Sequence, residues 1–194
     1  MIAAEEVVLV LLAAGRSERF GAADKLEADL NGTPLGLHAV ATLADLSFRA
    51  RLAVRSGCAL DFAVHGYVDI ANPRPELGMS GSVRLGVARA RAMGAAAVLI
   101  ALADMPRVTV AHVRRLLEAG GAAGAVVASS DGMKPTPPAL FGRDRFDALL
   151  GLTGDAGARD LLRGGRHVVA DPAELVDIDT PEELQSLRDR VRER

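Results

Sequence analysis

Residues 7–15 read VVLVLLAAG, an unbroken apolar run that stops at a glycine. Two similar runs occupy residues 96–103 and 124–128. Alternation of apolar and polar residues would indicate strands with one solvated face, whereas continuous runs predict strands covered on both faces, as in a mainly parallel sheet. Shorter apolar segments are weaker strand candidates and lie at 52–54, 62–64 and 168–170.

Helical patterns, with apolar residues three or four positions apart, separate the predicted strands. They cover residues 33–46, 80–93, 110–117 and 181–192. The last pattern follows Thr180 as N-cap, with Pro181 at the first helical position and Glu183 at the third, which is a capping box. Strands that alternate with helices predict an α/β fold, a doubly wound Rossmann-like domain with right-handed crossovers. In such sheets ligands bind beyond the carboxyl ends of the strands.

A small hairpin extension is predicted late in the chain. Asp131-Gly132 is a hairpin turn sequence, and the prolines at 135, 137 and 138 are expected to keep this arm off the central sheet. With 194 residues and no internal repeat or linker, the chain is expected to form a single domain over residues 1–194.

The composition excludes several classes of function. A net charge of −2 provides no field for holding nucleic acid or an anionic membrane, and 3% aromatic residues provide no base-stacking surface. Residues 1–6 lack a basic segment and the apolar run after them is too short to span a membrane, so we expect a cytoplasmic protein. Cys58, the single cysteine, excludes an internal disulfide and a cysteine-based zinc site, and we expect it to be a small buried hydrophobe.

The loop after the first predicted strand is the first candidate site. Residues 15–21 read GRSERFG and are followed by Lys25, one of only two lysines, because 21 of the 23 basic residues are Arg. The glycine spacing excludes both a Walker loop and a dinucleotide fingerprint. Backbone N–H groups near Gly15, together with Arg19 and Lys25, would suit a triphosphate. The alternative is a tight turn with solvated arginines.

Residues 12–21, LAAGRSERFG, followed by DKL at 24–26, resemble the signature of the MobA-like nucleotidyltransferases. Within that superfamily the sequence is most similar to the molybdenum cofactor cytidylyltransferases. The similarity extends along essentially the whole chain. Further segments resemble the family's motifs in the expected order: NP at 72–73 with GMSGS at 78–82, ADMP at 103–106, GDAGAR at 154–159 and DIDTPEEL at 177–184.

The resemblance implies roles for individual residues. It assigns catalytic roles to Arg19, Lys25 and Asp104, and acceptor contacts to Asp155 and Arg159. Two positions depart from the family pattern, since Gly81 stands where a Ser is usual and Pro137 stands where a His or Asn is usual. The residues expected to bind the nucleotide are Leu12, Ala13, Ala14, Gly15, Arg19, Lys25, Asn72, Gly78, Ser80 and Ser82. For the serines, the alternative is an ordinary helix N-cap.

Two carboxylates are the candidate metal ligands. Asp104 follows the predicted strand at 96–103, where a carboxylate at the carboxyl end of a buried strand is placed to hold Mg²⁺. The alternative is a turn-capping Asp beside Pro106. Asp177 and Asp179 are expected to share one face of an extended segment, and the family motif favours Asp179 as the second ligand.

The resemblance implies a Mg²⁺-dependent enzyme that transfers CMP from CTP to molybdenum-bearing molybdopterin and releases pyrophosphate. The implied partners are an NTP, with CTP favoured, a phosphorylated pterin acceptor, and a molybdoenzyme as recipient of the product. One alternative is a guanylyltransferase, or another small-acceptor nucleotidyltransferase, on the same fold. Another is a non-catalytic nucleotide-binding protein that delivers the cofactor. The role of Lys134 stays open between a phosphate contact and a solvated hairpin residue.

Overall fold

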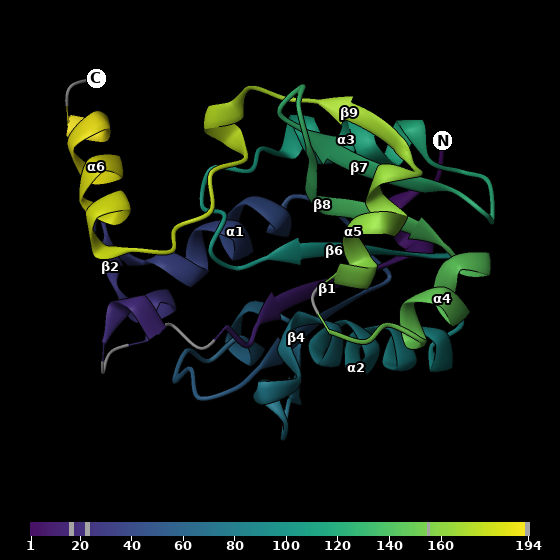
Figure 1. The fold of residues 1–194 in the computed structure, drawn as a ribbon, viewed down its shortest axis with the longest axis horizontal. Coiled ribbons are helices and arrows are strands. Elements are labelled where there is room, and N and C mark those ends of the chain that lie inside the picture. Colours follow the sequence, from purple (N-terminus) through teal and green to yellow (C-terminus); the bar gives the residue numbers. More distant parts are fainter. Residues whose placement is uncertain (16–17, 22–23, 155, 193–194) are drawn as a thin grey trace.

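A seven-stranded sheet organises the residues that the computed structural model describes, which are 1–15, 18–21, 24–154 and 156–192. The strand order is β5-β4-β1-β6-β8-β7-β9 (Figure 1). Strand β8 runs antiparallel to β6 and β7, whereas β1 pairs in parallel with β4 and β6, β4 with β5, and β7 with β9. The bounds are β1 Val7–Ala13, β4 Ala50–Arg55, β5 Val68–Ala71, β6 Ala97–Leu102, β7 Val126–Ser130, β8 Pro135–Gly142 and β9 Arg166–Val169. The predicted α/β class with a mainly parallel sheet is confirmed.

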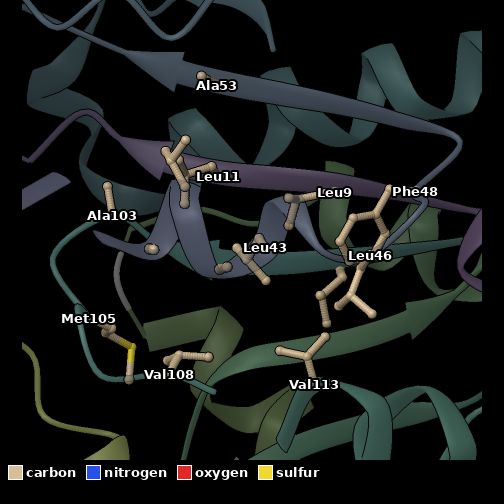
Figure 2. Packing of buried hydrophobic residues seen from close by; sticks show 14 of the residues in the cluster. Leu9, Leu11, Leu43, Leu46, Phe48, Ala53, Ala103, Met105, Val108 and Val113 are labelled. Carbon is tan, nitrogen blue, oxygen red and sulfur yellow. The ribbon is translucent and has the colours of Figure 1, made fainter. Parts of the chain in front are cut away.

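Helices cover both faces of β1, and all seven of its residues are buried. Leu9 and Leu11 pack in one core cluster with residues of α1 and α3, and Figure 2 shows both leucines near Leu43 of α1. Val8 and Val10 point to the opposite face and pack with residues of α2, α4 and α5. The helices are α1 Leu35–Ala44, α2 Gly78–Ala92, α3 Val110–Ala119, α4 Phe146–Leu150, α5 Ala156–Arg163 and α6 Pro181–Arg192. The continuous apolar run therefore corresponds to a strand buried on both sides, as predicted.

Helix α6 stands at one end of the molecule, beside the label of β2 in Figure 1. It packs through Leu184 and Leu187 into a separate small cluster with Leu30. The predicted capping box is confirmed: Thr180 Oγ1 accepts from the Glu183 backbone N at 3.2 Å, and Glu183 Oε2 accepts from the Thr180 backbone N at 2.9 Å. Across the described part of the chain, no helix combines the length and apolar character that a membrane crossing requires.

The strand predicted at 62–64 is wrong. Phe62 is fully buried, but a 3₁₀ helix follows it at Ala63–His65 and ends at Gly66, whose φ is +79°. The ring of Phe62 packs at 6.3 Å from that of Tyr67, so the apolar residues serve a turn. The strand in this region is the later β5, an edge strand of low burial whose pattern carries little hydrophobic signal.

The helix predicted to begin at Thr33 begins two residues later. Thr33–Pro34 forms β3, which pairs with β2 at Asp29–Leu30. Asn31 and Gly32 connect them with φ values of +55° and +86°. Asn-Gly is the usual sequence of a two-residue hairpin turn with positive φ at both positions, so this signal was present in the sequence.

The expectation that the proline-containing arm stays off the central sheet is wrong for its second half. The hairpin at Asp131-Gly132 exists, but residues 139–142 of β8 pair with β6 in the middle of the sheet. The prolines precede this stretch, beyond the pairing with β6, where a missing N–H removes no hydrogen bond to that strand. The arm is therefore a central strand whose proline-containing end projects past its neighbour.

A buried polar chain holds this projecting end to the rest of the sheet. The Nε2 atom of His112 lies 2.7 Å from Ser129 Oγ, which donates to the Pro138 carbonyl at 2.6 Å, and both side chains are buried. Arg115 donates to His112 Nδ1 at 3.0 Å, so the proton on the ring resides on Nε2. Burial, followed by the charge of Arg115, lowers the pKa of His112, and Glu174 opposes that shift.

Candidate active site

A cleft of about 980 Å³ opens at the carboxyl ends of β1 and β6. In Figure 1 the arrowheads of these parallel strands point toward the side of the molecule that carries α6. Eleven of the residues predicted for the site line the cleft: Leu12, Ala14, Gly15, Arg19, Lys25, Gly78, Ser80, Ser82, Asp104, Arg159 and Asp179. The cleft thus lies where a doubly wound sheet is expected to bind its ligand.

The ammonium of Lys25 joins the two candidate metal ligands. Its Nζ donates to Asp104 Oδ2 at 2.7 Å and to Asp179 Oδ1 at 2.7 Å. The side chain of Lys25 is 8% exposed, whereas those of Asp104 and Asp179 are 19% and 44% exposed. Arg19 approaches from the rim, with Nη1 at 3.4 Å from Asp179 Oδ2. The structure therefore brings together side chains that are 79 and 154 positions apart in the sequence.

Local backbone structure places each of these three groups. Lys25 begins a 3₁₀ helix, Lys25–Glu27, whose N-cap Asp24 accepts from the Leu26 backbone N at 2.9 Å. Asp104 follows β6, and its carbonyl accepts from the Ile178 backbone N at 3.0 Å. This contact fixes the segment that carries Asp177 and Asp179. Glu183 of the capping box also accepts from the Asp179 backbone N at 2.7 Å, so the cap holds the second carboxylate.

Residues 177–179 confirm the expected alternation of side chains without forming a strand. Ile178 is fully buried, whereas Asp177 and Asp179 both line the cleft. Asp179 contacts Lys25 directly, and Asp177 acts on Asp104 only through its charge. Of the pair, Asp179 has the direct contact with Lys25, and its role as a metal ligand stays a prediction.

The electrostatics of the site are those of excess negative charge. Burial raises the pKa of Asp104, and the charges of Asp177 and Asp179 raise it further, while Lys25 opposes this. Burial would lower the pKa of Lys25, but Asp104 and then Asp179 raise it above the ordinary value. The hydrogen bond from Lys25 lowers the pKa of Asp179. Near Asp104, three carboxylates are offset by the ammonium of Lys25 and the guanidinium of Arg19, which leaves an excess of negative charge that favours an additional cation.

The residues present fit a divalent metal ion. The Oδ1 atom of Asp104 is buried and has no hydrogen-bond partner among the described residues. A buried carboxylate oxygen without a donor is costly unless a cation or donor approaches it. Together with Asp179 it supplies the hard oxygen ligands that Mg²⁺ and Mn²⁺ prefer. Asp104 and Asp179 are thus the residues that would hold such an ion.

The first helical turn of α2 forms a second wall of the cleft. Ser82 lines it and accepts on Oγ from Asn72 Nδ2 at 3.0 Å. Asn72 is itself buried and does not line the cleft, and its Oδ1 accepts from the Arg74 backbone N at 2.9 Å. Ser80 also lines the cleft and donates to the Leu77 carbonyl at 3.2 Å. Asn72 therefore positions Ser82 from behind.

Ala13 is the other predicted nucleotide-binding residue that does not line the cleft. It packs in the core cluster on the α1 and α3 side, because side chains alternate along β1. Leu12 and Ala14, its neighbours in sequence, do line the cleft. The side chain of Ala13 thus faces away from the cleft, and a contact from its backbone to the nucleotide stays a prediction.

The opposite wall carries basic side chains, among them Lys134, whose role the sequence leaves open, and Arg163, which the sequence motifs do not predict. Lys134 lines the cleft, and its backbone N donates to Asp131 Oδ1 at 2.8 Å in the hairpin turn. Arg159 lines it as predicted, and so does Arg163, one turn later on α5. The spacing of four residues on a helix was the available signal for Arg163. Asp155 lies outside the described residues.

Comparisons with known proteins agree with this architecture. Residues 9–171 match the family described as MobA-like NTP transferase domain. Purine catabolism protein PucB of Bacillus subtilis (strain 168) is 39% identical over 119 residues, which are 58% of this chain and 57% of PucB. The chain thus spans little more than half the length of that relative.

Solved structures extend the similarity to nearly the whole chain. Rv0371c from Mycobacterium tuberculosis H37Rv superposes with a TM-score of 0.78 at 27% identity, covering 97% of this chain and 100% of that one. A structure of the same mycobacterial protein in complex with manganese gives a TM-score of 0.72 at 26% identity, covering 94% and 98% of the two chains.

Proposed function

Because this chain belongs to the MobA-like NTP transferase domain family, we propose that it transfers CMP from CTP to molybdenum-bearing molybdopterin and releases pyrophosphate. The observation that carries the proposal is the contact of Lys25 with Asp104 and Asp179 at 2.7 Å each, inside the cleft at the carboxyl ends of β1 and β6. These groups suit the transfer of a phosphoryl-linked nucleotide, in which positioning and charge stabilisation supply most of the catalysis.

In the proposed reaction an ionised phosphate oxygen of the acceptor attacks the α-phosphorus of the nucleotide. A new P–O bond forms while the bond to the bridging oxygen of the β-phosphate breaks, and pyrophosphate leaves with that electron pair. An ionised phosphate needs no general base, so the site requires no activated Ser, Cys or His. Lys25 and Arg19 would stabilise the charge that develops on pyrophosphate. A divalent cation held by Asp104 and Asp179 would neutralise phosphate oxygens.

The nucleotide half of the proposal assigns the base and ribose to the wall formed by the start of α2. Ser80 and Ser82 on that wall would supply hydrogen-bonding groups for the base and ribose, and Leu12 of β1 also lines the cleft. The anionic groups of the acceptor would bind at the opposite wall, which carries Lys134, Arg159 and Arg163. Both halves meet at Asp104 and Lys25, where the two phosphates would react.

Mg²⁺ is the proposed resident cofactor, and the manganese complex of the mycobacterial neighbour supports a divalent ion on this fold. The printed name of PucB links that relative to purine catabolism. A guanylyltransferase on the same fold is the main competing reaction. A non-catalytic cofactor carrier is the competing class, and it would not need metal-binding carboxylates.

The test incubates the purified protein with Mg²⁺ and molybdenum-loaded molybdopterin, adds CTP, GTP, ATP or UTP in separate reactions, and measures the pyrophosphate formed. The expected result is release with CTP that depends on the acceptor. Asp104→Asn is expected to slow it by about 10²–10³-fold. Asp45→Asn, on an exposed residue after α1, is the matched control and is expected to retain full turnover. Release with GTP in place of CTP would assign guanylyl transfer, and no release with any nucleotide would refute transfer to molybdopterin in favour of another acceptor or a carrier.

A further inference from the structure

The ammonium of Lys25 occupies the position between the carboxylates that a divalent cation needs. It lies 2.7 Å from Asp104 Oδ2 and 2.7 Å from Asp179 Oδ1, in a side chain only 8% exposed. Both proposed metal ligands are thus already bound to one cation of the chain itself. The remaining Asp179 oxygen faces Arg19 at 3.4 Å. A metal ion that enters alone must compete with a buried, fixed charge.

The competition is costly for a bare metal ion. Mg²⁺ and Mn²⁺ bind carboxylate oxygens at short distance, so an ammonium hydrogen-bonded to the same two carboxylates would repel them strongly. Displacing the ammonium of Lys25 leaves a buried positive charge that has lost two carboxylate partners. Such a charge is stabilised only if another anion takes the place of the carboxylates. A triphosphate is an anion of the required charge, and it arrives with its own metal ion.

The neighbouring backbone gives such an anion access to Lys25. The position that a Cβ atom would occupy at Gly15 lies 3.9 Å from Cε of Lys25, so the loop after β1 runs beside the lysine stem. Gly15 is exposed to the cleft and carries no side chain that would separate the loop from a phosphate. The stem of lysine is unbranched and flexible, so the ammonium of Lys25 is expected to reach from the carboxylates toward a phosphate beside Gly15.

We infer that Lys25 is the resident counter-ion of the metal site, and that the protein binds its divalent cation as a metal–nucleotide complex rather than as a free ion. On binding, the metal takes the oxygens of Asp104 and Asp179, and the ammonium of Lys25 transfers to the phosphates. This inference rests on the proposed function for the identity of the anion. The competition between Lys25 and the metal does not depend on turnover.

The first test measures Mn²⁺ binding by electron paramagnetic resonance, without nucleotide and with a non-hydrolysable α,β-methylene analogue of CTP. In the absence of nucleotide, Lys25→Met is expected to bind Mn²⁺ about tenfold more tightly than the wild type. The scale follows from the roughly 1–3 pKa units by which a neighbouring cation changes the affinity of a carboxylate for a proton. Lys134→Met, the other lysine on the cleft, is the matched control and is expected to leave the affinity for free Mn²⁺ unchanged.

Adding the analogue tests the second part of the inference, that the divalent cation binds together with the nucleotide. In the wild type it is expected to tighten Mn²⁺ binding at least tenfold, and in Lys25→Met most of this coupling is expected to be lost. Free Mn²⁺ binding by Lys25→Met that is no tighter than in the wild type would overturn the inference, whatever the pyrophosphate assay shows. An analogue that does not bind at all would count against the proposed function, while the nucleotide-free comparison would still decide the role of Lys25.

A second measurement uses the wild-type chain and therefore stands if the variant does not fold. The sequence has two lysines, so ¹⁵N-lysine labelling gives two ammonium signals, and Lys134→Met assigns them by difference. At one fixed Mg²⁺ concentration, the Lys25 signal is expected to stay in place without nucleotide and to shift when the nucleotide analogue is added. A full shift with the same Mg²⁺ alone would refute the counter-ion role.

Discussion

The close approach of α2 to β1 depends on Gly86, and its substitution by Ala tests how tightly the cleft wall is set. A Cβ at position 86 would lie 2.3 Å from Cγ1 and 3.2 Å from Cγ2 of Val10. Ordinary contact begins near 3.4 Å, so either the helix or the strand must move by about 1 Å. Val10 is fully buried, so rotating its side chain away from the added atom would push a methyl group against other core residues.

The expected cost of Gly86→Ala is a difference of two terms. Forcing a methyl group into a packed core costs about 1–3 kcal/mol, and replacing Gly by Ala within a helix returns about 1 kcal/mol. The net loss in the free energy of unfolding is therefore about 0–2 kcal/mol. Because Ser82 lies one turn earlier on α2 and lines the cleft, the same shift is expected to weaken nucleotide binding.

The assay is urea denaturation of the four proteins of a double-mutant cycle. Val10→Ala alone removes two buried methyl groups and is expected to cost about 2–3 kcal/mol from lost burial and the cavity. In the double variant the methyl group at position 86 enters the space left by Val10, whose Cβ lies at an ordinary 3.4 Å from it. The double variant is thus expected to be at least as stable as Val10→Ala. Additive losses, within about 0.5 kcal/mol, would refute the argument that Val10 is the obstacle.

Three further perturbations test other contacts. Asn72→Ala leaves Ser82 without its buried donor and is expected to weaken binding of the CTP analogue in titration calorimetry, with a stability loss of about 1–3 kcal/mol in urea. The pKa of His112 is lowered in the folded chain, so below about pH 6.5 the unfolded chain binds a proton that the folded chain does not. The free energy of unfolding therefore falls by up to about 1.4 kcal/mol for each pH unit of acidification. His112→Gln is expected to show a shallower fall between about pH 7.5 and 5.5. Thr180→Ala removes the acceptor for the Glu183 backbone N and is expected to lower the urea-unfolding free energy by about 1 kcal/mol.

Much of the fold was accessible from the sequence because its strongest signals are local. The run at residues 7–13 is apolar at every position, and a strand covered on both faces buries all of them. The capping box at Thr180 and Glu183 also involves residues three apart, so its geometry follows from the helix itself. The failure at 62–64 has the same origin, because an apolar triplet in a turn has the same local pattern as a short strand.

The predictions for the site also divide into those that a sequence pattern supports and those that depend on three-dimensional packing. The motifs placed Lys25, Asp104 and Asp179 in one cleft, because the carboxyl ends of parallel strands converge. Their mutual contact depends on side-chain reach and on Ile178 joining the Asp104 carbonyl, neither of which has a sequence pattern. Asn72 shows the converse case. The motif predicts a ligand contact for Asn72, but its amide donates to Ser82. The direction of this amide depends on three-dimensional packing and has no sequence pattern.

Position 25 is a lysine in a chain whose basic residues are otherwise Arg at all positions but one. Lysine suits this position because the ammonium first bridges two carboxylates and then moves to a phosphate. An ammonium is a compact charge that donates to two different carboxylates at 2.7 Å within a nearly closed space. A guanidinium is planar and binds best to one carboxylate or phosphate through two parallel bonds, so it would favour one partner. Transfer of the charge from the carboxylates to a phosphate needs a flexible stem and donors that reorient freely, and lysine has both. Arg19, which is 69% exposed at the rim, has room for the larger group and has to hold only one partner at a time.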